Sequence, residues 1–418
     1  MISVLCVSHS SERNGAELWL LETLRHLDRK AFAPALVVPR PGPMVSEAEA
    51  AGVPVEVVPM KWWVTEKSKV WRQPAAWAMN RKAVNRIAAI ARTRGAHVVL
   101  SNSAATFGGA LAAKKAGLPH VWSLHEVLGG ERAFLHYLYG ARALTRFILD
   151  HSARVIVNSE GTRSVFPASE KIALIYNGLS MRSGDPALRA AARSEFGLVE
   201  GEPAVGVIGK LYPGKGQREV LQAVARLASR YPRLKLLILG EAAVAGYERE
   251  LRAIVRREKL NGRVFFTGFR PDLSEILQTL SAVVVASVVD SFGRAALEAM
   301  AAGVPVLAVR AGGLTEIVQP GWNGFLAESR DPAVLAEALA DLLDHPEHRP
   351  AIIENGFRTI REKFSIERQV KDVERVLREA AGGTLLVPPP FGAGRDGAYF
   401  AADRGREVGE SEGRERKG

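Results

Sequence analysis

The chain of 418 residues has a single cysteine, Cys6, so no disulfide can form within it. Because disulfides are rare in reducing compartments, we expect a cytoplasmic protein. Residues 1–10 lack a basic segment and a cleavage site, and they are more typical of a first strand than of a signal peptide. No window approaches about 18 uninterrupted apolar residues, so a membrane-spanning helix is not expected.

Metal-binding patterns are also missing. The sequence has no Asp-x-Asp pair and no His/Cys cluster, so we expect neither a metal site nor a cofactor. No recognised nucleic-acid module or aromatic RNA platform is present, which argues against a nucleic-acid partner.

Positive charge is concentrated in the first half. Residues 1–178 carry 22 Lys and Arg against 13 Asp and Glu, whereas residues 179–380 carry 28 against 26. The excess favours an anionic partner for the first half, such as a lipid surface, a nucleotide or an acidic glycan.

Short β-branched runs alternate with alanine-rich helical stretches, which predicts βαβ units and mainly parallel sheets, an α/β fold. Expected strands of the first half are Ser3–Ser8, Pro34–Val38, Val55–Val58, His97–Ser101, His120–Leu124, Arg154–Asn158 and Ile172–Ile175. Expected helices include Ala16–Leu27, Pro74–Arg94, Ser103–Ala116 and Arg132–His151. Expected strands of the second half are Ala204–Gly209, Leu234–Leu239, Val264–Thr267, Ala282–Ser287 and Val304–Ala308.

The restart of this pattern predicts two Rossmann-like domains. We assign residues 1–178 to the first, 179–203 to a Gly/Ser/Pro-rich linker and 204–380 to the second, with the last helix packing back on the first domain. Residues 381–418 are rich in Gly, Pro and charge and are expected to be disordered. Ligands bind beyond the carboxyl ends of parallel strands, so two facing domains imply an interdomain cleft.

Residues 207–217, VIGKLYPGKGQ, follow a predicted strand and open a helix. A glycine loop before a helix N-terminus binds anions, and Lys210 and Lys215 would neutralise a diphosphate there. The alternative is that both lysines are merely solvated in a turn.

Residues 287–306 place Asp290 and Glu298 around a Ser-Phe-Gly turn between a strand and an alanine-rich helix. Both carboxylates fall on one side of the helix, which suits the hydroxyls of a sugar and a ribose. Alternatively, Asp290 only caps the following helix.

The order of these motifs resembles the retaining glycosyltransferases of glycosyltransferase family 4. The motifs that carry the resemblance are, in chain order, Gly-Lys-Leu, Gly-Lys-Gly, Phe266–Arg270, Asp290 with Glu298, Gly312–Val318 and Asn323–Phe325. The pair Asp290 and Glu298 stands where the family has Glu-x7-Glu, so Asp290 replaces the first glutamate. The resemblance runs from about Ser3 to about Ala380. It implies a GT-B fold, in which two Rossmann-like domains face each other.

The resemblance implies roles for residues of the second domain. Lys210 and Lys215 would bind the donor diphosphate, Lys210 standing where the family more often has Arg. Asp290 would bind the donor sugar and Glu298 the ribose. The remaining implied contacts are the backbone N–H groups of Phe292 and Gly293 at the sugar, and Phe269 and Arg270 at the nucleobase. The alternatives are core packing for Phe269 and a solvated charge for Arg270.

In the first domain, residues 10–17 resemble the family's Gly-Gly-Ala-Glu loop, with Asn14 in place of the first glycine and Gly15 as the second. Such a loop lets the backbone approach the diphosphate and the acceptor, and Asn tolerates positive φ better than most residues. His125 and Glu126 resemble a His-Asp pair near the reacting carbon. The turn at Asn177-Gly178 is interpreted as structural.

Residues 61–94 contain nine Lys or Arg, one acid and four tryptophans, namely Trp62, Trp63, Trp71 and Trp77. Basic residues with tryptophan are typical of a helix that lies on an anionic membrane. The alternatives are tryptophans partly in the core, or a site for a soluble anionic acceptor.

These observations predict a retaining, metal-independent glycosyltransferase of glycan, polysaccharide or glycolipid synthesis, at the inner face of the membrane if residues 61–94 bind lipid. It would move a sugar from a nucleotide-diphosphate donor to a hydroxyl on a glycan, a lipid-linked acceptor or a small molecule. The alternatives are a nucleotide-sugar isomerase or phosphorylase of the same architecture, and a non-catalytic nucleotide-sugar-binding protein.

Overall fold

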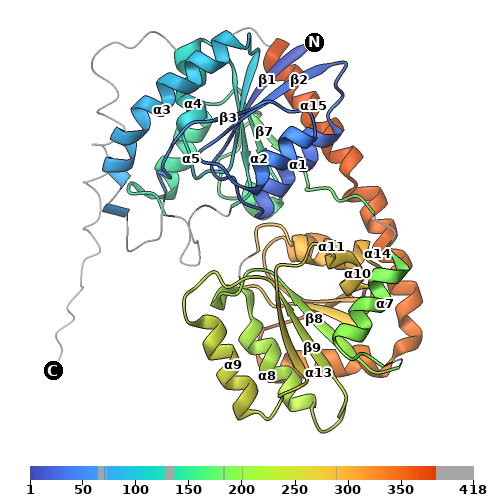
Figure 1. The fold of residues 1–418 in the computed structure, drawn as a ribbon. Coiled ribbons are helices and arrows are strands. Elements are labelled where there is room, and N and C mark those ends of the chain that lie inside the picture. The colour runs from blue at the N-terminus through green and yellow to red at the C-terminus, as the bar shows by residue number, and fades with distance from the viewer. Residues whose placement is uncertain are drawn as a thin grey trace, which may run out of the picture.

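The computed structural model describes residues 1–64, 70–71, 73–126, 128, 136–181, 184–199, 201–288 and 290–382. These residues form two parallel β-sheets, each covered by helices on both faces, which make the two lobes of Figure 1. The expected α/β class with two Rossmann-like units is confirmed. The tail expected to be disordered lies outside the described residues from position 383 onward.

The first sheet has the strand order β3-β2-β1-β4-β5-β6-β7, and all its pairs are parallel. Because β1 pairs with both β2 and β4, the strand order reverses at β1 and β4. The strands are β1 (Ile2–Ser8), β2 (Phe32–Val38), β3 (Val55–Val57), β4 (Val98–Asn102), β5 (His120–Leu124), β6 (Arg154–Val157) and β7 (Ile172–Leu174).

Helices bury both faces of this sheet. The sequences of its strands are therefore continuous apolar runs and do not alternate between apolar and polar residues. In β1, Val4 and Cys6 pack into one core cluster, whereas Leu5 and Val7 pack into another on the opposite face. Burial raises the pKa of the Cys6 thiol to about 12. The helices are α1 (Gly15–His26), α2 (Pro43–Ala50), α3 (Gln73–Thr93), α4 (Gly108–Ala116), α5 (Gly140–Asp150) and α6 (Glu160–Arg163).

The second sheet has the parallel order β10-β9-β8-β11-β12-β13, and its strand order reverses at β8 and β11. The strands are β8 (Ala204–Ile208), β9 (Lys235–Leu239), β10 (Val264–Gly268), β11 (Ala282–Val285), β12 (Val306–Val309) and β13 (Phe325–Ala327). Sequence reasoning missed β13, because three residues are too few to show a periodic pattern.

The helices of the second unit include one in the expected linker. Asp185 caps the helix α7 by accepting the N–H of Ala187 at 2.8 Å, and Pro186 opens it. Phe196 and Leu198 then enter the core of the second unit, so most of 179–203 is not a free connection. The helices are α7 (Pro186–Glu195), α8 (Gln217–Leu227), α9 (Tyr247–Arg257), α10 (Leu273–Leu277), α11 (Arg294–Ala301), α12 (Leu314–Ile317), α13 (Pro332–Asp344), α14 (Arg349–Lys363) and α15 (Ile366–Gly382).

Two predicted helices of the first unit begin later than expected. The prediction placed a helix from Ser103, but α4 begins at Gly108, because Ser103 has a φ of +85° and Ala104 donates to the carboxylate of Glu126 at 3.1 Å. The helix predicted over 132–151 is observed as α5 from Gly140, and residues 132–135 lie outside the described residues.

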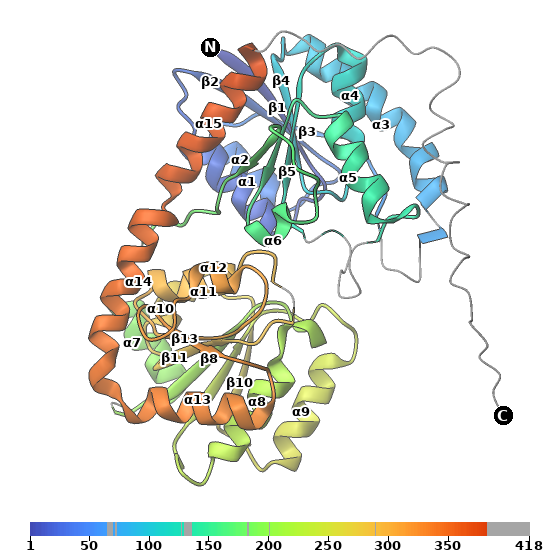
Figure 2. The ribbon, with the colours of Figure 1, turned by 180° about the vertical axis from the view of Figure 1, so that it is seen from behind.

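The long helix α15 leaves the second unit and packs on the first, as Figure 2 shows along one side of the molecule. Val373, Val376 and Leu377 belong to the same core cluster as Trp19 and Leu20 of α1. In the part of the chain that the structure describes, no helix is long and apolar enough to cross a bilayer.

Candidate functional site at the carboxyl ends of the two sheets

The loop after β8 carries both predicted lysines. Lys210 is exposed, whereas Lys215 ends the short 3-10 turn Pro213–Lys215 just before α8. Gly216 has a φ of +73°, and a Cβ there would lie 2.3 Å from the carbonyl oxygen of Ala286. Only glycine allows this approach, which brings the loop after β8 against the end of β11.

That approach joins Lys215 to Asp290. The ammonium Nζ lies 3.0 Å from Oδ2 of the carboxylate, and both side chains are largely buried. Burial opposes the charge on each group, but the mutual attraction outweighs it: the pKa of Lys215 is raised and the pKa of Asp290 is lowered. The pair is therefore ionised at neutral pH.

Asp290 shapes the turn ahead of α11 without capping the helix itself. Its Oδ1 accepts the N–H of Phe292 at 3.3 Å, whereas the N-cap of α11 is Gly293. The helix-cap reading of Asp290 is therefore wrong. In this structure the N–H of Phe292, expected to face the donor sugar, is bonded within the turn, and the ring of Phe292 is buried.

Glu298 lies one turn further along the helix than Arg294, which donates to its carboxylate at 2.8 Å. Glu298 also contributes to the raised pKa of Lys215, so its charge is close to the lysine. Sequence reasoning missed Arg294. Its position four residues before Glu298 on a predicted helix was the available signal.

Phe269 and Arg270 follow β10. The Phe269 side chain is 49 % exposed, which rules out core packing for this residue. The Arg270 guanidinium is bound by Glu195 and Asp272, at 2.6 and 2.8 Å, and these carboxylates raise its pKa. The Arg270 guanidinium is therefore engaged by two carboxylates in this structure, and its contact with a nucleobase stays a prediction.

The loop after β1 contains Asn14 and Gly15. Asn14 precedes α1 with a φ of −98°, so the positive φ considered for it is not adopted. Its amide donates to the buried Glu17 at 3.1 Å, and Nε2 of His9 lies 3.6 Å from the same oxygen. A Cβ at Gly15 would meet nothing within 4 Å, so the packing of the protein does not require a glycine there.

His125 follows β5 at the same edge of the first sheet. Its Nε2 lies 2.8 Å from Oδ1 of Asn102 and 3.1 Å from Oγ of Ser123, and its ring is 4.9 Å from that of Trp19. Burial lowers its pKa to about 3, with a smaller contribution from His9. The amide oxygen of Asn102 can only accept, which assigns the proton to Nε2 and leaves Nδ1 as an acceptor.

Glu126 does not extend from this edge toward a ligand. Its carboxylate accepts the hydroxyl of Ser103 and the N–H groups of Ala104 and His125, the last two at 3.1 Å. Glu126 therefore holds the loop after β4 and the backbone of His125 in place.

The two edges face each other, because loops that follow strands of opposite sheets are in contact. The Arg13 guanidinium, after β1, lies 5.5 Å from the centre of the Phe269 ring, after β10. The carboxylate of Glu316 in α12 accepts the N–H groups of Glu160 and Gly161 at the start of α6, at 3.0 and 3.3 Å. The structure thus brings both strand-order reversals to the boundary between the units.

The basic segment 61–94 is only partly a surface. Trp63 lies in the core at 2 % exposure and Trp77 is half-buried, whereas Trp62 and Trp71 are 43 and 68 % exposed. The α3 residues Arg81, Lys82 and Arg86 are exposed, while Ala83, Ile87 and Ala91 of the same helix are buried. Residues 65–69 and 72 lie outside the described residues.

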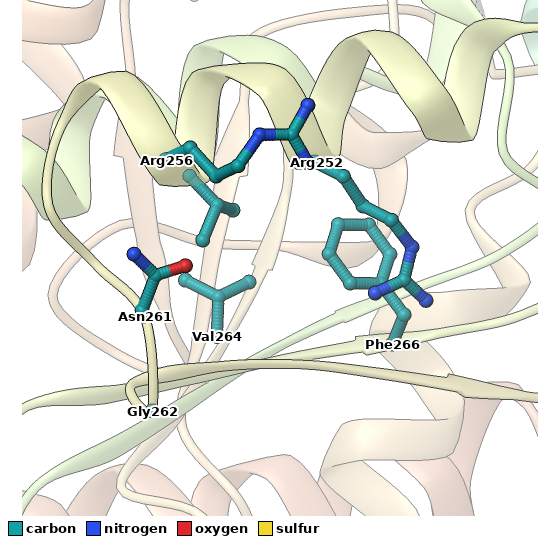
Figure 3. A pocket seen from close by; sticks show the side chains of 7 residues that line it. Arg252, Arg256, Asn261, Gly262, Val264 and Phe266 are labelled. Atoms are coloured by element: carbon teal, nitrogen blue, oxygen red, sulfur yellow. The ribbon is translucent and has the colours of Figure 1, made fainter.

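Two other features lie away from this boundary. A cavity of about 170 Å³ sits at the edge strand β10 beside α9, lined by Arg252, Asn261 and Phe266 among others (Figure 3). Arg252 is already engaged there by Glu248 and by the Phe266 ring, 4.3 Å away. Among the described residues, His345, Glu347 and His348 could bring three metal-ligating atoms together, but all three are exposed between α13 and α14.

Two family profiles match this chain, one over each of the two structural units. The profile of "Glycosyltransferase Family 4" matches residues 13–182, and that of "Glycosyl transferases group 1" matches residues 189–359. The D-inositol 3-phosphate glycosyltransferase of Saccharomonospora viridis is 30 % identical over 300 residues, which cover 66 % of this chain and 69 % of the relative. That of Corynebacterium urealyticum is 33 % identical over 223 residues, 50 % of this chain and 52 % of the relative.

The alignment spans about half the length of several such curated relatives. Among solved structures, Anabaena HepE in complex with UDP-glucose superposes with a TM-score of 0.76 at 25 % identity, covering 91 % of this chain and all of the other. Sucrose-phosphate synthase of Thermosynechococcus elongatus superposes at 0.72 with 18 % identity, covering 92 % of this chain, and shares the fold. The chain has the GT-B fold and belongs to the group 1, family 4 glycosyltransferases.

Proposed function

We propose that this chain is a retaining, metal-independent glycosyltransferase that moves a sugar from a nucleotide-diphosphate donor to a hydroxyl acceptor. The observation that carries the proposal is the ionised pair of Lys215 and Asp290 at the strand-order reversal of the second sheet. Nucleotide ligands of parallel sheets bind at such reversals, and a buried ammonium beside a helix N-terminus suits a diphosphate. We propose a first domain of residues 1–178 and a second of residues 204–380 around this site, with α7 of the connecting segment packed on the second domain and α15 packed back on the first.

In this proposal the donor diphosphate lies on Lys215 and the exposed Lys210. The acceptor hydroxyl attacks the anomeric carbon from the face that the diphosphate leaves. The bond from that carbon to the phosphate oxygen breaks, its electron pair goes to the diphosphate, and the departing oxygen takes the hydroxyl proton. The raised pKa of Lys215 keeps the ammonium charged, so it stabilises the negative charge that develops.

Neither carboxylate acts as a nucleophile in this scheme. Asp290 is bound by Lys215 and Glu298 by Arg294, so both are held as hydrogen-bond acceptors for hydroxyls of the sugar and the ribose. We further propose that His125, neutral at physiological pH, accepts a hydrogen bond from a donor-sugar hydroxyl at Nδ1 once donor binding shifts the side chains that bury this atom, which has no partner among the described residues. Asn14 and Gly15 would let the backbone of the loop after β1 approach the diphosphate. The N–H of Gly293 would donate to the sugar, and Phe269 would lie beside the nucleobase.

The donor and acceptor classes come from the relatives. HepE was crystallised with UDP-glucose, which makes a UDP-sugar the first donor to test. Several relatives are named for D-inositol 3-phosphate, so a hydroxyl on a small phosphorylated acceptor is the first acceptor to test, beside glycans and lipid-linked acceptors. We also propose a cytoplasmic location, with α3 lying against an anionic membrane in polysaccharide or glycolipid synthesis.

The test is release of the nucleoside diphosphate from UDP-, GDP- and ADP-glucose, with and without acceptors and with EDTA. We expect release that needs an acceptor and survives EDTA, and a product with the anomeric configuration of the donor by NMR. An inverted product or loss of activity with EDTA contradicts the retaining, metal-independent scheme. An acceptor-independent change in the sugar supports an isomerase instead, and binding without turnover supports a non-catalytic protein; the comparisons favour neither.

A further inference from the structure

The chain crosses between the two units twice, and the crossings lie side by side. The first runs through Gly178 and Leu179, and the second through Phe364 and Ser365. The N–H of Leu179 donates to the carbonyl of Phe364 at 2.8 Å, and the N–H of Gly178 donates to Oε1 of Gln369 in α15 at 2.6 Å. Any change in the angle between the units must act on this junction.

The proposed donor-sugar turn packs directly on the junction. Tyr176, just before the first crossing, has its ring 5.2 Å from that of Phe364 and 6.1 Å from that of Phe292. The rings of Phe292 and Phe364 are 5.7 Å apart. One aromatic cluster therefore contacts both crossings and the turn that holds Asp290.

Glu316 ties the same turn to the first unit. Its Oε2 accepts the hydroxyl of Tyr176 and the N–H of Glu160, each at 3.0 Å, and its Oε1 accepts the N–H of Gly161 at 3.3 Å. The two N–H donors lie at the start of α6 in the first unit, whereas Tyr176 lies just before the first crossing, where its ring packs against the core of the second unit. Hydrogen bonds to a carboxylate are among the stronger ones, and opening the boundary would break the two bonds to α6.

The short helix α12, which carries Glu316, also supports the Asp290 turn from behind. The N–H of Gly313 donates to the carbonyl of Asp290 at 2.9 Å. Leu314 packs so close to Gly293 that a Cβ on the glycine would lie 2.8 Å from its Cδ2. A displacement of Glu316 is thus transmitted through rigid contacts to the residues around the proposed donor sugar.

We propose that Glu316 is a positioning residue, which with Tyr176 couples the angle between the two units to the shape of the Asp290 turn. The effect of this coupling on catalysis rests on the proposed function, whereas the coupling itself is a property of the protein without ligand. Glu316 contacts the start of α6 in the first unit, and its helix α12 contacts the Asp290 turn in the second unit. The Asp290 turn would therefore have the shape that binds the sugar only when the two units are closed. Burial, and next the carboxylate of Glu316, raise the pKa of Tyr176 to about 12, so its hydroxyl stays a donor at neutral pH.

Three full-length variants test the coupling. Tyr176→Phe keeps the ring and loses the hydroxyl, and Glu316→Gln keeps the shape and loses the charge. The matched control is Tyr231→Phe, which removes a tyrosine–carboxylate bond to Asp344 on the far side of the second unit. For each free chain, small-angle scattering reports the separation of the units, and amide hydrogen exchange reports the stability of residues 290–298.

We expect Tyr176→Phe and Glu316→Gln to increase the radius of gyration and to speed exchange at 290–298 by about tenfold, while Tyr231→Phe changes neither. With UDP-glucose turnover, kcat should fall about tenfold while the Kd for UDP alone changes less than about threefold. Unchanged scattering and exchange in both variants would overturn the coupling. If the unchanged protein binds no nucleotide, the proposed function fails, while scattering and exchange still decide the coupling.

Discussion

The Nζ atom of Lys215 lies 3.0 Å from Oδ2 of Asp290, although 75 residues separate them in the chain. The contact joins the loop after β8 to the turn after β11, the two positions where the second sheet reverses its strand order. A donor diphosphate bound there would share the ammonium with the carboxylate, so the pair ties donor binding to the stability of the fold.

Removing Lys215 should destabilise the protein as well as its donor site. In Lys215→Ala the largely buried carboxylate of Asp290 loses its cation, and we expect the free energy of unfolding to fall by about 3 kcal/mol. Lys215→Met combined with Asp290→Asn should recover most of the loss. Urea denaturation measures both, with the exposed Lys210→Ala as a control that shifts stability by less than about 0.5 kcal/mol. A single-variant loss no larger than that of the control contradicts the buried pair.

The buried histidines should make the protein sensitive to acid. Burial lowers the pKa of both His120 and His125 from 6.5 to about 3, with the His151 and His9 charges as the second causes. Between these values the unfolded chain binds a proton at each imidazole and the folded chain does not. The free energy of unfolding should therefore fall as the pH drops below 6.5, by up to about 1.4 kcal/mol per pH unit for each histidine.

Urea titrations at about pH 7, 6 and 5 measure this slope. We expect His125→Asn to flatten it, and the exposed His348→Asn serves as the control. A slope that is identical in all three proteins shows that His125 titrates normally when folded.

Two glycines should differ in how much the same substitution lowers the stability of the protein. Gly293 has a φ of +107° and no room for a Cβ beside Leu314, so Gly293→Ala should cost about 2 kcal/mol of stability. Gly15→Ala meets open space and should change stability by less than about 0.5 kcal/mol, yet it should weaken donor turnover if the loop after β1 approaches the diphosphate. Thermal denaturation and nucleotide release measured together separate the two effects. Full turnover in Gly15→Ala argues against that approach.

The exposed basic face of α3 should bind anionic vesicles. Combining Arg81→Glu, Lys82→Glu and Arg86→Glu should abolish sedimentation with phosphatidylglycerol vesicles, because each basic side chain contributes about 1 kcal/mol near such a surface. The control is Arg256→Glu with Arg257→Glu on α9 of the second unit. If the α9 variant loses as much binding as the α3 variant, the attraction is general and α3 is no docking face.

Sequence patterns predicted the strands well because parallel strands buried on both faces are short apolar runs, as at His120–Leu124, where prediction and structure coincide. They failed where a local signal was overlooked: Asp185-Pro186 is a helix start, an N-cap followed by proline, and it opens α7 inside the expected linker. The predicted start of α4 was wrong because the carboxylate of Glu126, distant in sequence, binds Ser103 and the N–H of Ala104 and holds them outside the helix.

The sequence yielded candidate site residues, which stay predictions, but not the pairings between them. The motifs indicated Lys215, Asp290, Glu298 and His125, and the structure brings them to the two sheet edges. Sequence spacing gave no sign that Asp290 would bind Lys215, or that Glu316 would bridge to Tyr176 140 residues away. Such contacts depend on how distant loops pack, which a single sequence does not encode locally.

Calorimetric titration with UDP-glucose tests the central claim most directly, in the unchanged protein, in Lys215→Ala and in Glu298→Ala, each checked to be folded. Lys363→Ala, an exposed lysine on α14, is the control. We predict saturable binding that both site variants weaken by at least about tenfold and the control leaves intact. Binding of equal strength in all four proteins, or no binding of UDP-, GDP- or ADP-glucose to the unchanged protein, contradicts a donor site built on Lys215 and Glu298.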